Sequence, residues 1–204
     1  DYPWDVRTEK MCLAMTQAGH TVHIVARNRQ WSPSLETLPE ATVHRMKPWK
    51  SLGRHVDAVL GFPAFFNPRW YTLIRDTARA SAADVIIVRD LPLCPTAIRA
   101  GRKLRLPVIL DMAENYPAMM RDRESSARNV VVDALVRNPR LVELVERYSV
   151  QKVAWTLTVV EESSDRLVKI GANPERMSVV SNTPPRARAQ HPIQRAATPS
   201  DRIT

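Results

Sequence analysis

Cysteine is scarce in this sequence, which holds two among 204 residues. Cys12 and Cys94 each fall within an expected helix, which favours reduced thiols in a cytoplasmic protein over a disulfide framework. The five histidines are scattered and show no spacing typical of metal ligands. We therefore expect neither a disulfide-stabilised module nor a metal site.

Long hydrophobic runs are also lacking. No uncharged apolar stretch approaches the length of about 20 residues that spans a bilayer, and no cleavable leader pattern opens the chain. These absences argue against an integral membrane chain. With 44% apolar and 25% charged residues, the composition is typical of a globular domain.

Acidic residues are in the minority, with 21 Asp and Glu against 30 Lys and Arg, and the net charge is +9. Such a surplus gives a protein affinity for polyanions, namely nucleic acid, anionic lipid or phosphorylated small molecules. The alternative is a surface that uses arginine for solubility. The basic residues are dispersed and interleaved with acidic ones, as in the run RDRE at 121–124. That pattern is typical of a solvated face and disfavours a nucleic-acid-binding module.

Apolar runs alternate with helical patterns along the chain. Strands are expected at residues 21–26, 41–46, 84–88, 108–111, 156–160 and 177–180. Helices are expected from a cap at Asp5 to Gly19, and at residues 68–80, 92–104, 127–136, 139–154 and 164–170, with 47–67 irregular. Alternation with short loops predicts a doubly wound, Rossmann-like parallel sheet with helices on both faces.

The first expected helix carries two further expectations. Its inward face is expected to hold Met11, Ala14, Met15 and Ala18, because these residues recur at helical spacing. A doubly wound sheet begins with a central strand, and this chain begins with the helix that would follow it. We therefore expect the first central strand to be missing and the isolated chain to be marginally stable or prone to aggregate.

Residues 107–117, PVILDMAENYP, carry the clearest chemical signal. A run without polar alternation suits a strand buried on both faces, and it ends in the carboxylate of Asp111, with Glu114 three residues later. Ligands bind beyond the carboxyl ends of such strands. Asp111 and Glu114 are candidates to orient hydroxyl groups of a ligand or to accept a proton, and Tyr116 stands beside them. The alternative is that Asp111 caps a turn and Glu114 pairs with an arginine.

Three more residues bear on the same edge of the sheet. Arg89 and Asp90 follow the strand at 84–88, where an exposed loop ion pair is the alternative interpretation. Arg7 lies in the first turn of the first helix, where backbone amides and a guanidinium together favour phosphate. A solvated arginine near Glu9 is the alternative there.

Four stretches of the chain carry a family resemblance. They read DYPWDVRTEKMCLAMTQAGHTVHIVARN, DVIIVRDLP, PVILDMAENYP and WTLTVVEESSDRLVKIGANPERMSVVSNTP. In this order they resemble the N-terminal domain of glycosyltransferase family 4, enzymes of the two-domain GT-B architecture. The chain departs from that pattern at Ala113, where many members carry histidine, so a histidine contact to the acceptor is in doubt.

The resemblance implies a cytoplasmic, retaining hexosyltransferase that needs no metal or other cofactor. It would take a nucleotide-sugar donor and a glycan, lipid-linked or small-molecule acceptor, as in cell-envelope or polysaccharide biosynthesis. It places the catalytic glutamates in a C-terminal donor domain that this chain lacks. Residues 1–182 would form the acceptor-side domain, with Asp111, Glu114, Asn115, Tyr116, Arg89 and Asp90 toward the acceptor and Arg7 toward the donor phosphates. Asn182 would mark the hinge, and residues 183–204 would be the linker to the donor domain, so the chain alone is expected to be inactive.

The stretch 45–71 mixes cations with aromatic residues, among them Lys47, Trp49, Lys50, Phe66 and Arg69. Cations beside exposed rings suit peripheral contact with an anionic membrane, whereas packing of the rings beneath a loop is the alternative. A different function is a nicotinamide-dependent reductase, since Arg27 and Asn28 after the strand at 21–26 suit a 2′-phosphate. No Tyr-x-x-x-Lys pair supports it.

Overall fold

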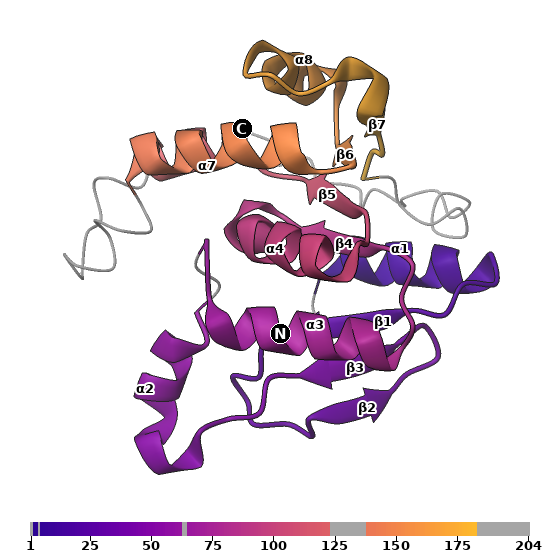
Figure 1. The fold of residues 1–204 in the computed structure, drawn as a ribbon, viewed down its shortest axis with the longest axis vertical. Helices are drawn as coiled ribbons and strands as arrows, with labels where there is room; N and C mark the ends of the chain where they lie inside the picture. The colour runs from indigo at the N-terminus through magenta and orange to yellow at the C-terminus, as the bar shows by residue number, and fades with distance from the viewer. Residues whose placement is uncertain (1, 4, 63–64, 123–137, 183–204) are drawn as a thin grey trace, which may run out of the picture.

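The computed structural model describes residues 2–3, 5–62, 65–122 and 138–182. Within them the chain alternates strands and helices and forms two sheets with helices packed around them (Figure 1). The helix expected at 127–136 and the linker expected at 183–204 lie outside the described residues.

The larger sheet is four-stranded and entirely parallel, in the order β4-β5-β6-β7. Its strands are β4 (Ile86–Arg89), β5 (Val108–Met112), β6 (Trp155–Thr158) and β7 (Met177–Val179). Each strand reaches the next through a helix, as right-handed crossovers require. The predicted doubly wound α/β architecture is confirmed by this sheet.

The smaller sheet is three-stranded, in the order β1-β3-β2. β1 (His23–Ala26) pairs in parallel with β3 (Thr42–Arg45), and β2 (Leu35–Thr37) pairs with β3 in the antiparallel sense. β2 was not predicted. Among the described residues, β1 and β4 each have a strand partner on one side only.

The described helices cover these sheets. α3 packs beside α4 and against β1, α4 lies on β4 and β5, and α8 lies against β6 and β7 (Figure 1). The helical segments are α1 (Val6–Gln17), η1 (Lys50–Leu52), α2 (Gly53–Leu60), α3 (Pro68–Ala80), η2 (Leu91–Leu93), α4 (Cys94–Leu104), α5 (Tyr116–Asp122), α7 (Pro139–Lys152), α8 (Glu161–Lys169) and η4 (Pro174–Arg176).

The core lies between the four-stranded sheet and the helices α4 and α7. Leu91, Ile98, Leu110 and Val142 are almost completely buried in it. Near the carboxyl end of β5, the charged Asp111 is buried as well, with 1% of its side chain exposed. A buried ion pair therefore lies beside the apolar core where the strands end.

Three expectations about packing were wrong. α1 buries Arg7 and Cys12 instead of the expected apolar face, because its first turn packs against the polar strand ends. The strand at 84–88, expected to be buried, is only partly so, because Ile87 in β4 is 36% exposed. The stretch 47–67 is not wholly irregular, because it contains η1 and α2.

Candidate functional site

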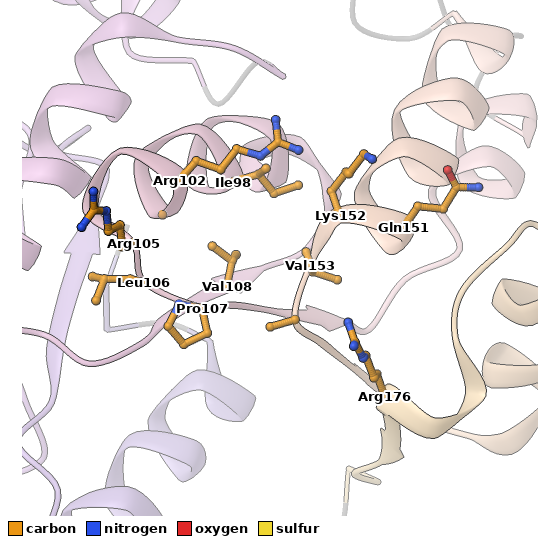
Figure 2. Close-up of a pocket in the computed structure, with 12 residues that line it drawn as sticks. Ile98, Arg102, Arg105, Leu106, Pro107, Val108, Gln151, Lys152, Val153 and Arg176 are labelled. Carbon is orange, nitrogen blue, oxygen red and sulfur yellow. The ribbon is translucent and has the colours of Figure 1, made fainter.

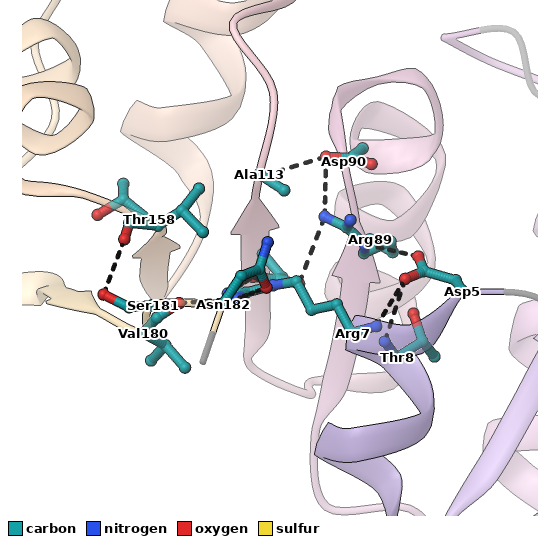
Figure 3. Close-up of polar contacts among 12 residues, drawn as sticks. Asp5, Arg7, Thr8, Arg89, Asp90, Ala113, Thr158, Val180, Ser181 and Asn182 are labelled. Atoms are coloured by element: carbon teal, nitrogen blue, oxygen red, sulfur yellow. Dashed lines mark hydrogen bonds and ion pairs between the residues drawn. The ribbon is translucent and has the colours of Figure 1, made fainter. Parts of the chain in front are cut away.

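The predicted site residues meet where β4, β5 and β7 end and α1 begins (Figure 3). The register aligns Arg89 at the end of β4 with Asp111 near the end of β5. We call the group Asp5, Arg7, Arg89, Asp90 and Asp111 the strand-end cluster. It lies at the sheet edge where open α/β proteins bind ligands.

Arg7 and Asp111 form the centre of the strand-end cluster. Arg7 donates from Nε to Asp111 Oδ2 at 3.0 Å and from Nη2 to Oδ1 at 2.6 Å. Only 6% of the Arg7 side chain and 1% of the Asp111 side chain are exposed. A buried charge requires such a paired, hydrogen-bonded arrangement, and the fork of a guanidinium matches both carboxylate oxygens.

The remaining nitrogen of Arg7 joins the chain after β7 to the same group. Nη1 donates to the carbonyl of Val180 at 2.7 Å and to Oδ1 of Asn182 at 3.0 Å. Every guanidinium nitrogen of Arg7 is thus engaged within the domain, so it does not present a free face to a phosphate. Asn182, predicted at the hinge, is exposed and is held by Arg7 (Figure 3).

Asp5 connects α1 to β4. Its Oδ1 caps the helix by accepting from the backbone N–H groups of Arg7 and Thr8, and its Oδ2 accepts from Arg89 Nε at 3.0 Å. Partial burial works to raise the pKa of Asp5, but the hydrogen bond and charge of Arg89 outweigh it and hold that pKa below its usual value. The capping role was expected, whereas the pairing with Arg89 was not, because nothing local in the sequence indicates it.

Asp90 has an unusual backbone and an unusual pKa. It adopts φ 63°, and its Oδ1 accepts from Arg89 Nη1 at 3.1 Å and from the backbone N–H of Ala113 at 3.2 Å. Burial raises the pKa of Asp90 to about 6 against the opposing effect of these donors, with the charges of Asp111 and Glu114 adding to the rise. A carboxyl group with such a pKa exchanges protons near neutrality, which suits either a proton acceptor or a hydroxyl ligand.

The residues after β5 lie on the outer side of the strand-end cluster. Glu114 and Asn115 are exposed, and within the described part of the chain Glu114 forms no ion pair. Asn115 accepts through Oδ1 from the backbone N–H of Ala118 at 3.3 Å, which fixes the start of α5. Tyr116 is half-buried against the core, and burial followed by the charge of Asp90 raises the pKa of its hydroxyl.

The charge of this edge is opposite to that of the whole chain. The carboxylates of Asp5, Asp90 and Asp111 pair with the guanidinium groups of Arg7 and Arg89, and the exposed carboxylate of Glu114 adds a further negative charge that helps to raise the pKa of Asp90. A surplus of hydrogen-bond acceptors favours neutral ligands that carry several hydroxyl groups over anionic ones. Among the described residues, no group of three or more His, Cys, Asp or Glu side chains could hold a metal ion.

The structure brings the sequence-predicted site residues together but gives them unequal access. Asp111 and Arg7 are buried against each other, so a direct contact of either with a ligand would require breaking their ion pair. Arg89 and Asp90 do form the loop ion pair considered as an alternative, at 3.1 Å, and they remain partly exposed. Glu114 and Asn115 are the most accessible of the set.

Arg27 and Asn28, the two residues that suggested a reductase, contact other parts of the domain. Asn28 is buried, and its amide closes a turn by donating to the carbonyl of Ser32 and accepting from the Ser32 N–H, both at 2.8 Å. Arg27 lies over the ring of Phe62, with its guanidinium carbon 5.6 Å from the ring centre. This geometry does not favour a 2′-phosphate site after β1.

Comparison with known proteins decides between glycosyl transfer and the reductase and nucleic-acid-binding alternatives. The sequence profile of the glycosyl transferase 4-like domain matches residues 5–183, almost the whole described chain. The chain belongs to the glycosyl transferase 4-like family. This assignment favours glycosyl transfer over the reductase and nucleic-acid alternatives and agrees with the resemblance found in the four sequence stretches.

A solved structure supports the fold of this glycosyl transferase 4-like domain. Sucrose-phosphate synthase from Thermosynechococcus elongatus superposes with a TM-score of 0.57 at 10% sequence identity, covering 86% of this chain and 41% of that protein. The likeness confirms a GT-B type Rossmann-like fold, and the domain spans about two-fifths of the length of that relative. No curated protein sequence matches the chain.

Proposed function

We propose that this glycosyl transferase 4-like domain forms the acceptor side of a retaining hexosyltransferase. The enzyme would move a sugar from a nucleotide-sugar donor to a hydroxyl group of a glycan, lipid-linked or small-molecule acceptor, in envelope or polysaccharide biosynthesis in the cytoplasm. The family assignment supports glycosyl transfer. The observation that carries the acceptor assignment is the acidic edge at the ends of β4 and β5, where carboxylates can accept hydrogen bonds from vicinal hydroxyl groups.

The geometry divides the site residues by role. Glu114, Asn115 and Asp90 are accessible and are proposed to contact the acceptor, with Tyr116 and Arg89 beside them. Arg7 and Asp111 are proposed as positioning residues, because each satisfies the charge of the other inside the domain. This refines the expectation that Arg7 binds a donor phosphate.

Asn182 is proposed to mark the boundary with a donor-binding domain. Its contact with Arg7 joins the end of the acceptor domain to the strand-end cluster. Movement at the hinge would therefore displace Arg7, which also holds Asp111. Residues 183–204 would then form the interdomain linker. On this proposal, the catalytic glutamates and the nucleotide site belong to the second domain, and no metal or other cofactor is needed.

A membrane contact is proposed through α2 and its surroundings. Val56 and Val59 are exposed on α2, and the exposed rings of Trp49 and Phe66 lie on either side of it in the sequence. The exposed Lys50 opens η1, directly before α2. Rings, aliphatic side chains and a cation on one segment suit insertion at the level of anionic head groups.

The acceptor assignment is tested with the complete gene product, a panel of nucleotide sugars and a panel of glycan acceptors. Glu114→Gln keeps the size of the side chain but weakens a charged hydrogen bond to a hydroxyl, which is worth about 1.5–3 kcal/mol. We expect the KM for acceptor to rise about tenfold or more, while the KM for donor changes little. Glu175→Gln, at an exposed site on η4, is the matched control and should leave both constants unchanged. An equal rise in both KM values would contradict the assignment.

A further inference from the structure

A second polar site lies at the opposite end of the four-stranded sheet. A pocket of about 390 Å³ opens where β5 begins, and Arg102, Arg105, Lys152 and Arg176 surround it (Figure 2). β5 rises by roughly 3.3 Å per residue. Three residue steps along β5 therefore separate Val108 at the pocket from Asp111 in the strand-end cluster, a distance of roughly 10 Å.

The four cations come from three segments of the chain. Arg102 lies in the last turn of α4, Arg105 directly after that helix, Lys152 at the end of α7 and Arg176 at the end of η4. All four side chains are exposed. The cations thus converge on the pocket from segments that lie far apart in the sequence.

No carboxylate offsets these charges in the pocket. Its lining contains no Asp or Glu, and within the described residues none of the four cations takes part in an ion pair or a side-chain hydrogen bond. Four unpaired cations around one hollow repel one another. That repulsion is relieved when an anion binds between them.

The floor of the pocket is apolar and closely packed. Val108 and Val153 are buried there, and Gly101 allows α4 to approach so closely that an added Cβ would lie 2.5 Å from Val108 Cγ2 and 2.9 Å from the Leu106 carbonyl. The amide of Gln151 at the rim supplies a neutral hydrogen-bonding group. The volume lies in the range of about 300–1,000 Å³ that is typical of small-molecule sites.

We propose that this pocket binds a ligand carrying a phosphate group, separately from the acceptor and donor sites. Arginine forks bind phosphate oxygens in pairs, and a lysine adds a point charge. A phosphate between α4, α7 and η4 would fasten three segments that support the four-stranded sheet. The phosphate could come from a free metabolite or from an anionic lipid head group, and its chemistry is the same in both cases.

The test measures binding of inorganic pyrophosphate to the full chain by calorimetry and by thermal unfolding. We expect saturable binding and a rise in Tm, since a ligand of the folded state stabilises it. Arg102→Gln combined with Arg176→Gln should weaken binding at least tenfold. The matched control combines Lys103→Gln with Lys169→Gln, two exposed lysines outside the pocket lining, and should change the dissociation constant less than twofold. Equal weakening in both double variants, or no saturable binding, would overturn the proposal.

A second measurement needs no variant. Pyrophosphate should protect Lys152 from an amine-reactive reagent in the wild-type protein while Lys103 reacts at an unchanged rate, as read by mass spectrometry; equal protection of both lysines counts against the pocket. Sedimentation with phosphatidylglycerol vesicles then distinguishes the two sources. A lipid source predicts that the arginine double variant loses vesicle binding and that pyrophosphate competes with the vesicles. A soluble source predicts unchanged vesicle binding beside weakened pyrophosphate binding.

Discussion

The Arg7 guanidinium and the Asp111 carboxylate form a two-pronged buried ion pair across 104 residues of sequence, with one Nη2–Oδ1 distance of 2.6 Å. The pair joins the first turn of α1 to the end of β5, and Arg7 extends it to Val180 and Asn182. One arginine therefore holds the first helix, a central strand and the proposed hinge in register.

Removing the charge of Asp111 should destabilise the domain strongly. Asp111→Asn leaves Arg7 buried without a counter-charge, and loss of one partner of a buried pair costs about 3–5 kcal/mol in the free energy of unfolding. Urea unfolding measures this loss. The exposed variant Asp76→Asn, in the surface pair with Arg75, is the control and should leave the midpoint unchanged.

The double variant Arg7→Met with Asp111→Leu separates the cost of leaving one buried charge unpaired from the effect of removing both charges. Replacing both members of a buried pair by apolar groups is often neutral, so the double variant should be more stable than Asp111→Asn alone. If the double variant is the less stable of the two, the ion pair must stabilise the folded domain by more than the avoided cost of an unpaired buried charge. Because Arg7→Met also removes the hydrogen bond to Asn182, the environment of Asn182 at the proposed hinge should change.

Stability should depend on the protonation of Asp90. Its pKa is raised to about 6 in the folded domain, chiefly by burial. The unfolded value is about 3.9. The folded state therefore holds more protons than the unfolded state between about pH 4 and 6. The resulting stabilisation, on the order of 3 kcal/mol, is present below pH 4 and is lost as the pH rises through 6.

Asp90→Asn isolates this effect. Asparagine tolerates the positive φ of 63° at this position and stays neutral at every pH. The variant should gain stability relative to the wild type as the pH rises from 4 to 6.5, when unfolding free energies are compared point by point. Other titrating groups, such as Asp5 with its lowered pKa, cancel in the difference. A difference that stays flat across this range would show that Asp90 titrates normally.

Gly101 should be intolerant of even a methyl group. An added Cβ would lie 2.5 Å from Val108 Cγ2 and 2.9 Å from the carbonyl of Leu106, so Gly101→Ala must push α4 away from β5. Overpacking of this kind costs about 1–3 kcal/mol, more than the gain in helix propensity. Lys103→Ala on the exposed face of α4 is the control, and chemical unfolding compares the two. Equal stability of both variants would mean that the helix shifts freely.

Local patterns predicted much of the fold. The helix predicted at 68–80 has its predicted bounds in the structure, where Asn67 caps it and Pro68 takes the first turn, in which no N–H is needed. The buried run of β5 likewise identified the centre of the parallel sheet. Such elements are determined by residues close together in the sequence, and the sequence therefore indicates them.

Long-range relationships could not be predicted in the same way. Nothing near Arg7 indicates that it pairs with Asp111 or that Asp5 pairs with Arg89, because those contacts exist only after the sheet has formed. β2 is three residues long and too short for a periodic signal. The sequence thus identified which residues lie at the strand ends but not which of them neutralise one another.

The exposed apolar face of α2 should carry the proposed membrane contact. Val56 and Val59 are 47% and 64% exposed, and Asp57 between them anchors the helix to Arg69 through a 3.0 Å ion pair. Inserting two such side chains into a head-group region is worth about 1.5–3 kcal/mol each. Val56→Ser combined with Val59→Ser should therefore reduce sedimentation with phosphatidylglycerol vesicles at least tenfold and leave the fold intact.

Leu144→Ser, at a 65% exposed site on α7, is the matched control. Equal loss in this control, or equal binding of the wild type to uncharged phosphatidylcholine vesicles, would exclude α2 as a specific anionic-membrane contact.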